Sequence, residues 1–132
     1  MNNYDISELE NTLRAILRNA GVADKVYLNR PKASDPAACF AVVTVTGSLT
    51  DLECYATGTV YFYLFARDVK EEKNGKKLSL MYGKLMEAVP RRSGRYIFDE
   101  NPTLIGDTGD DYGFHCRVVR MKVTVISPEA KL

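Results

Sequence analysis

Histidine is almost absent from this sequence, because His115 is the only one in 132 residues. A zinc site built from several histidines is therefore excluded, and a catalytic triad would depend on this one side chain. An acid would have to orient His115, yet its neighbour Cys116 points to the opposite face of a strand. We interpret His115 as a structural residue at a strand end and predict no catalytic residues; a small enzyme centred on it is the weakest alternative.

Cysteine is also scarce. Cys39, Cys54 and Cys116 are odd in number and widely spaced within predicted strands. We interpret them as reduced core thiols in a cytoplasmic setting, because free cysteine packs as a small hydrophobic residue. A Cys39–Cys54 disulfide remains an alternative if their strands are neighbours.

Long apolar runs and a charge excess are missing as well. No segment approaches the roughly 20 apolar residues that a membrane helix needs. The N-terminal residues MNNYDISELE lack the basic and apolar regions of a signal peptide, so we expect no secretory signal. With 18 basic and 17 acidic residues, the chain has no overall field that would draw it to nucleic acid or to an anionic membrane.

The most regular patterns predict two amphipathic helices. Apolar residues recur every three or four positions over 5–20, where Asp5 and Glu8 form a capping-box pattern and Gly21 follows as a C-terminal cap. A second helix is predicted over 76–89. Its apolar stripe consists of Leu78, Met81, Tyr82, Leu85, Met86 and Val89.

Most of the remaining chain has the pattern of β-strands, with apolar residues alternating or continuous. The predicted strands are residues 25–30, 39–46, 53–67 and 114–126, with short extended pieces at 96–98 and 103–105. We expect a turn at 47–51, a bulge or bend at Gly58 and an acidic, glycine-rich loop at 106–113. The order α-β-β-β-α-β-(β)-β predicts a single α+β domain over residues 1–132, a mostly antiparallel sheet with two helices packed on it.

Charged residues gather in two loops of opposite sign, one after the second helix and one before the last strand. The basic and acidic sets are Arg91, Arg92 and Arg95, and Asp107, Asp110 and Asp111. Solvated loops are the plain interpretation. We also treat both sets as a candidate subunit interface, in which the loops of neighbouring copies meet. Together with Asp99 and Glu100 the acidic set could bind a cation, but its spacing is not that of an EF-hand, and we expect no metal or cofactor.

Three tyrosines of the strand 53–67 lie on one face: Tyr55, Tyr61 and Tyr63. Such a row is similar to the aromatic platforms that stack nucleic-acid bases. The element order differs from that of an RNA-recognition module, so a core or subunit interface is the favoured interpretation. A small ligand- or nucleic-acid-binding module that uses the Tyr61/Tyr63 face and the loop 91–95 is the alternative.

The succession of segments is itself informative. It consists of the capped helix ELENTLRAILRNAG, the strands VYLNRP, CFAVVTVTG and TGTVYFYLFARD, the helix LSLMYGKLMEAVP and the strand FHCRVVRMKVTVI. From residue 7 to residue 126 this order resembles the small tail-completion or tail-terminator proteins of long-tailed bacteriophages and prophages. The loop KASDPAA and the stretch 99–111 are longer than in that pattern, which leaves open a sister role as a head–tail connector or minor tail protein.

The resemblance implies a function without catalysis. Members of this family form a ring, usually a hexamer, that caps the tail tube and joins it to the head. We therefore predict a structural assembly protein that self-associates and contacts the tail tube and head–tail connector proteins. It would reside in the virion tail and, during assembly, in the cytoplasm of the bacterial host. We expect no membrane partner, and nucleic acid only as DNA that passes through the ring.

Overall fold

The computed structural model describes residues 5–29, 36–51 and 54–127. Within them the chain forms two helices, α1 (Ile6–Ala20) and α2 (Gly75–Ala88). The strands in the same residues are β1 (Lys25–Tyr27), β2 (Cys39–Asp51), β3 (Tyr55–Arg67), β4 (Arg92–Ser93), β5 (Tyr96–Phe98), β6 (Thr103–Gly109) and β7 (Phe114–Ile126). The predicted α+β class, with two helices on a mostly antiparallel sheet, is confirmed.

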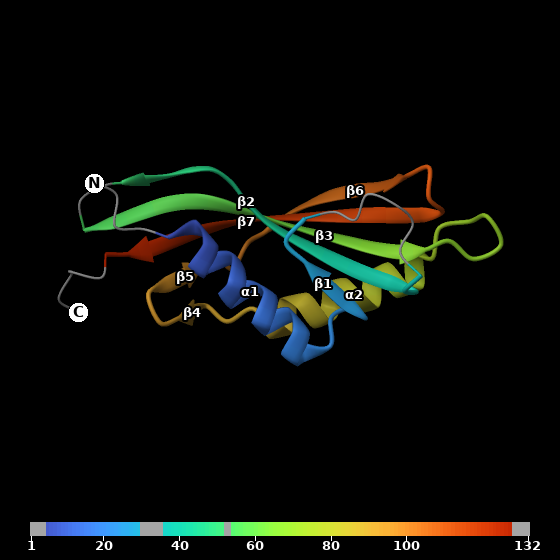
Figure 1. Ribbon diagram of the computed structural model, residues 1–132, viewed down its shortest axis with the longest axis horizontal. Helices are drawn as coiled ribbons and strands as arrows, with labels where there is room; N and C mark the ends of the chain where they lie inside the picture. The colour runs from blue at the N-terminus through green and yellow to red at the C-terminus, as the bar shows by residue number, and fades with distance from the viewer. Residues whose placement is uncertain (1–4, 30–35, 52–53, 128–132) are drawn as a thin grey trace.

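All these strands belong to one sheet, in the order β1-β2-β3-β7-β5-β4, with β6 also paired to β7. β1 and β2 are parallel, and the other described pairs are antiparallel. β3 and β7 form its centre and pair without interruption from Tyr55 opposite Ile126 to Arg67 opposite Phe114. β5 and β6 pair with different halves of β7, so they share one side of it (Figure 1).

Several predicted boundaries are wrong where strand pairing overrides local turn signals. The turn expected at 47–51 belongs to β2, whose pairing with β3 breaks after Thr46 and resumes at Thr50. The extra residues lie opposite Gly58, so the predicted bulge is in the partner strand. The acidic loop expected at 106–113 is strand as far as Gly109, because β6 continues beside β7. β1 ends at Tyr27, earlier than predicted.

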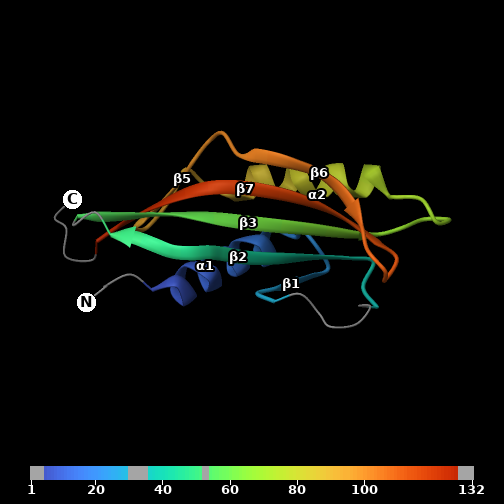
Figure 2. The ribbon, with the colours of Figure 1, turned by 90° about the horizontal axis from the view of Figure 1, so that it is seen from above.

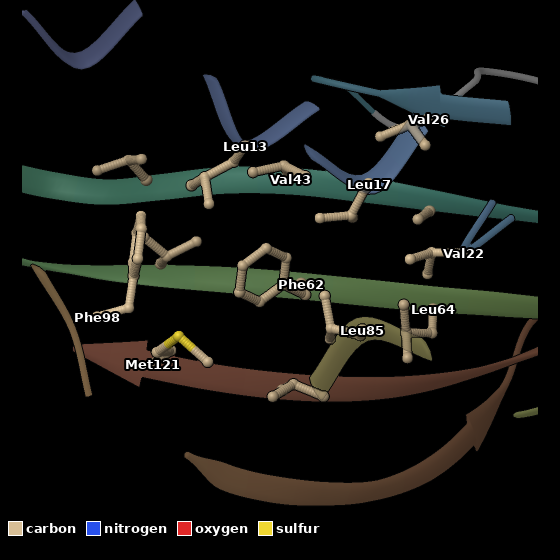
Figure 3. Packing of buried hydrophobic residues seen from close by; sticks show 14 of the residues in the cluster. Leu13, Leu17, Val22, Val26, Val43, Phe62, Leu64, Leu85, Phe98 and Met121 are labelled. Atoms are coloured by element: carbon tan, nitrogen blue, oxygen red, sulfur yellow. The ribbon is translucent and has the colours of Figure 1, made fainter. Parts of the chain in front are cut away.

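Both helices cover the same face of the sheet (Figure 1). α1 buries Leu9, Leu13 and Leu17, which share one side of the helix as the sequence predicts. Figure 3 shows Phe62 of β3 in the middle of this layer, with side chains of α1 and α2 around it. A residue such as Phe62, with no exposed surface, contributes about 3–5 kcal/mol when compared with alanine.

Capping residues set the limits of α1. Asp5 accepts hydrogen bonds from the backbone N–H groups of Ser7 and Glu8, at 2.9 and 3.3 Å. Gly21 ends the helix in the left-handed conformation, with φ of 66°, and donates to the carbonyl oxygen of Arg18. The predicted helix is confirmed, although the carboxylate of Glu8 binds elsewhere, as described below.

The other face of the sheet carries no helix among the described residues, and Figure 2 looks onto it. We call it the helix-free face. One end of this face is apolar: Phe40 stacks on Phe65, with ring centroids 4.5 Å apart, and meets the edge of Phe114 at 5.1 Å. The remainder carries threonine, tyrosine, arginine and lysine side chains. This division leaves a polar, accessible strip along the central strands.

Candidate functional site

The predicted basic and acidic loops lie at opposite ends of β7. The carbonyl oxygen of Arg95 accepts from the N–H of Ile126 at one end, at 2.8 Å. The N–H of Asp110 donates to the carbonyl oxygen of Phe114 at the other, at 2.9 Å. A strand of 13 residues spans about 40 Å. The two loops therefore do not meet within one chain, and only two different copies could bring them together.

Part of the basic loop is neutralised within the chain. Arg91 forms an ion pair with Glu100. Arg95 binds Glu8 of α1, with an N–O distance of 3.3 Å. Tyr96 also hydrogen-bonds to Glu8, and burial together with this bond raises the pKa of Tyr96 to about 12. The carboxylate of Glu8 thus ties the β4–β5 hairpin to the first turn of α1.

Asp107 is enclosed, with a side chain that is 5% exposed. It accepts two hydrogen bonds from Arg117, at 2.7 and 2.9 Å, and one from Lys73 at 3.3 Å. Arg117 also donates to the hydroxyl of Ser79 in α2, at 3.2 Å. The bonds from Arg117, more than the contact with Lys73, lower the pKa of Asp107. This placement removes Asp107 from the candidate subunit interface.

Contacts within the chain differ among the remaining candidate interface residues. The carboxylate of Asp110 closes the β6–β7 turn by accepting from the N–H groups of Tyr112 and Phe114, at 2.8 and 3.0 Å. Arg92 and Asp111 are exposed, and neither forms an ion pair with another described residue. Of the six charged residues singled out in the sequence, these two are exposed and have no ion-pair partner among the described residues.

His115 does have an acid partner. Its Nδ1 lies 2.6 Å from Oδ1 of Asp68, and the two side chains are 26% and 18% exposed. The other ring nitrogen faces Gly109, where an added Cβ would lie 3.1 Å away. Cys116 packs on the helix-free face with Phe114, as the alternation predicts. No described thiol or hydroxyl hydrogen-bonds to His115, so the pair fastens the end of β3 to β7.

The acidic residues do not assemble into a cation site. Within residues 5–29, 36–51 and 54–127, no three His, Cys, Asp or Glu side chains are grouped so that they could hold a metal ion. The N–H of Asp99 binds the carbonyl oxygen of Lys122, whereas Asp107 binds Arg117. These two positions are about 17 Å apart along β7. The acids that the sequence suggested as cation ligands are therefore not brought together at one place.

The candidate aromatic residues lie on the helix-free face. The rings of Tyr61 and Tyr63 are nearly parallel, with centroids 6.1 Å apart and planes inclined by 19°, and Tyr55 is 42% exposed. Burial, and then the neighbouring Tyr61, raises the pKa of Tyr63. Strand pairing sets Arg120 directly opposite Tyr61, and Lys122 follows on the same face. Aromatic rings and cations thus share the middle of this face.

The basic residues beside the tyrosines are not those of the loop 91–95 that the sequence suggested. Arg91 and Arg95 of the basic loop are held by carboxylates, as described above. Arg120 and Lys122 take their place, and the alternation of β7 already sets them on its polar side. Their position beside Tyr61 depends on the pairing of β7 with β3, which a pattern within one strand does not reveal.

Two hollows lie on the helix-free face at either side of Tyr61. A groove of about 430 Å³ has a mostly apolar lining that includes Val42, Tyr63, Phe65, Cys116 and Val118, with Thr44, Thr108 and Asp110 at its margins. A hollow of about 380 Å³ is lined by hydroxyls and one ammonium group, from Thr46, Thr57, Thr59, Lys122 and Thr124. The face therefore changes from apolar to polar along its strands.

The three cysteines are all free thiols. Cys39 and Cys116 are buried, and burial raises the pKa of the Cys39 thiol. Cys54 is exposed, so the prediction of three core thiols is wrong for this residue. Cys39 pairs with Ala66 near one end of β3 and Cys54 precedes the other end, about 36 Å away. This separation excludes the Cys39–Cys54 disulfide.

Comparison with known proteins bears on the fold alone. No family model and no curated protein sequence matches the chain. Its fold is similar to that of solved structures. One of these is named only by a sequence identifier, which indicates no activity. That structure superposes with a TM-score of 0.57 at 11% sequence identity, over 92% of this chain and 94% of the other. Neither described helix is long and apolar enough to span a membrane.

Proposed function

We propose that this chain is a structural assembly protein of a bacteriophage or prophage tail, of the terminator, completion or head–tail joining type. It forms a ring with copies of itself and contacts the tail tube. The observation that carries the proposal is the placement of Arg92 and Asp111, exposed opposite charges at the two ends of the long sheet. Surfaces that differ in this way suit head-to-tail contacts, which close into rings.

An open sheet edge adds a second surface for self-association. β6 pairs with β7 on one side, and its other side pairs with no described strand. Its side chains Leu104 and Ile105 are 50% and 42% exposed. An unpaired strand with exposed apolar side chains can add a strand from another molecule, so natural proteins usually cover such edges. A neighbouring copy would cover β6 in the ring.

The resemblance in segment order indicates the assembly of which such a ring would be part, namely a phage tail. The helices and long strands that carry the resemblance occupy one continuous sheet-and-helix domain. They share a well-formed core, since Phe62 and the leucines of α1 are completely enclosed by the chain itself. A small, stable domain with two association surfaces meets the physical needs of a ring subunit.

The test is to inactivate the gene in the phage or prophage that encodes the protein and to examine induced lysates by electron microscopy. We expect heads and tails to accumulate separately, and complete particles to return when the intact protein is supplied from a plasmid. A normal yield of complete particles without the protein would contradict the tail assignment. Native mass spectrometry of the purified protein, alone and with tail tubes, should show a closed oligomer, for which the resemblance implies six copies.

A further inference from the structure

The helix-free face carries positive charge without matching negative charge on its central strands. At the positions of β2, β3 and β7 that face this side and whose side chains are described, the charged residues are Arg67, Arg120 and Lys122. The chain as a whole is nearly balanced, with 18 basic and 17 acidic residues. The excess is therefore a property of this face, and it favours a polyanion as ligand.

Two of these cations are available to a ligand. Arg67 lies over the ring of Phe114, 4.7 Å from its centroid. Arg120 and Lys122 are exposed and form no ion pair with a described residue, although Arg120 lies 3.5 Å from the hydroxyl of Thr103. Two acids border the face: Asp99 accepts from the N–H of Asn101 at 2.9 Å, and Asp110, which also lines one end of the apolar groove, accepts from backbone N–H groups of the β6–β7 turn.

The aromatic pair stands directly beside these cations. Tyr61 is the cross-strand partner of Arg120, and its ring is nearly parallel to that of Tyr63. Nucleic-acid bases stack on such rings whatever their sequence, because every base has a π-face. An acidic protein segment could also pair with Arg120 and Lys122, but only a nucleotide chain carries both a phosphate and a flat base in every unit.

Along β3, polar side chains are followed by aromatic rings, and a nucleotide chain presents both phosphates and bases to such a surface. Thr57 and Thr59 lie in the polar hollow with Lys122, where hydroxyl and ammonium groups can bind phosphate oxygens. Tyr61 follows, and Tyr63 and Phe65 line the apolar groove, which can receive a base. From Thr57 to Phe65 the strand extends about 26 Å, which provides room for several nucleotides.

We infer that the helix-free face binds single-stranded nucleic acid, with phosphates beside Arg120 and Lys122 and bases against Tyr61 and Tyr63. A duplex keeps its bases stacked on one another, so it could use the cations but not the rings. The inference is independent of the proposed tail function, because it concerns one face of the monomer and needs no second copy.

The test measures the fluorescence anisotropy of labelled oligo-dT and oligo-U of about 20 nucleotides at salt concentrations from about 50 to 200 mM. We expect saturable binding that weakens as salt rises. Tyr61→Ala should weaken it roughly 5- to 150-fold, and Tyr61→Phe, which keeps the ring, should change it little. Arg120→Gln/Lys122→Gln should reduce the slope of log K against log salt by about 1.4, since each phosphate contact on a single strand contributes about 0.7.

The matched control is Arg14→Gln/Lys76→Gln, which removes one arginine and one lysine from the two helices on the opposite face. This control should bind the oligonucleotides with the same affinity as the unchanged protein. Thermal melts establish that each variant is folded, and the exposed pair Arg120 and Lys122 can be replaced without disturbing the core. Absence of binding at low salt would overturn the inference. So would an equal loss of affinity in the control variant, an unchanged affinity of Tyr61→Ala, or equally tight binding of a duplex of the same length.

Discussion

Asp107 is held by Arg117 because the pairing of β6 and β7 is irregular at this point. Regular pairing stops at Ile105 and resumes at Thr108, which sets Gly106 and Asp107 together opposite Arg117. A bulge of this kind redirects a side chain, and here it turns a carboxylate toward the guanidinium group. The ion pair therefore stabilises the edge strand that a neighbouring copy would cover in the proposed ring.

Asp107→Asn should lower the free energy of unfolding by about 2 kcal/mol at pH 7, because a charge-assisted pair is replaced by one amide oxygen. The pKa of Asp107 is lowered in the folded state. Its contribution is thus complete above the unfolded pKa of about 4 and is lost as pH falls through the lower folded pKa. Urea unfolding should show the two proteins converging below about pH 4. Lys73→Ala is the control, and its exposed ammonium should contribute under about 1 kcal/mol.

Gly109→Ala should destabilise the protein through His115. The new Cβ would lie 3.1 Å from Nε2 of the imidazole, which must move and weaken its contact with Asp68. We expect a loss of about 1 kcal/mol. In a His115→Ala background the same glycine substitution should cost almost nothing, since the obstacle is gone. Additive effects of the two changes in chemical denaturation would contradict this account.

The helices and the last strand were predictable because their signals are local. The predicted strand 114–126 is found as Phe114–Ile126, and α1 starts beside Asp5 and ends at Gly21, as its caps indicate. β6 was predicted only as far as Ile105, since the glycine and aspartate residues that follow are turn formers. Pairing with β7 and the bond from Arg117 make them a strand, and both contacts come from the next strand of the hairpin, not from the turn formers themselves.

Strand pairing also limits what the sequence predicts about the candidate sites. Alternation alone sets Tyr61 and Tyr63 on one face of β3, where the structure places them. It does not reveal that Arg120 is opposite Tyr61, because this depends on the register between two strands. Nor does it show that Asp107 is enclosed, because a bulge is needed to turn it inward. Local patterns identify which residues share a face, and pairing decides which of them meet.

The connection from β3 to α2 contains a strained turn, which projects beyond the sheet in Figure 1. Lys70 and Glu71 have φ values of 53° and 66°, between Val69 and Glu72, which exchange backbone hydrogen bonds. Asparagine and glycine suit this mirror-image turn better. Lys70→Asn/Glu71→Gly should therefore raise the free energy of unfolding by about 1 kcal/mol. Lys70→Pro should lower it, because proline cannot adopt a positive φ; a neutral result for both would contradict the strain.

Cys54 should be the one thiol that reacts readily in the folded protein. It is exposed, whereas Cys39 and Cys116 are buried and burial raises the pKa of Cys39. A chromogenic disulfide reagent should modify one thiol quickly and the others only when the chain unfolds. Cys54→Ser should abolish the fast phase, and Cys116→Ser should leave it unchanged. A fast phase that persists in Cys54→Ser would show that a buried thiol is accessible through local opening.

Arg92 and Asp111 give the sharpest test of how copies would associate. Reversing either charge, by Arg92→Glu or Asp111→Lys, should place like charges at each head-to-tail contact and reduce the oligomer seen by native mass spectrometry. Both changes together restore opposite charges, so the double variant should assemble again. Lys76→Glu alters a charge on the first turn of α2 and should leave assembly unchanged. If both single variants assemble normally, the contact does not involve these charges, and the open edge of β6 becomes the surface to examine, with Leu104→Lys as the corresponding variant.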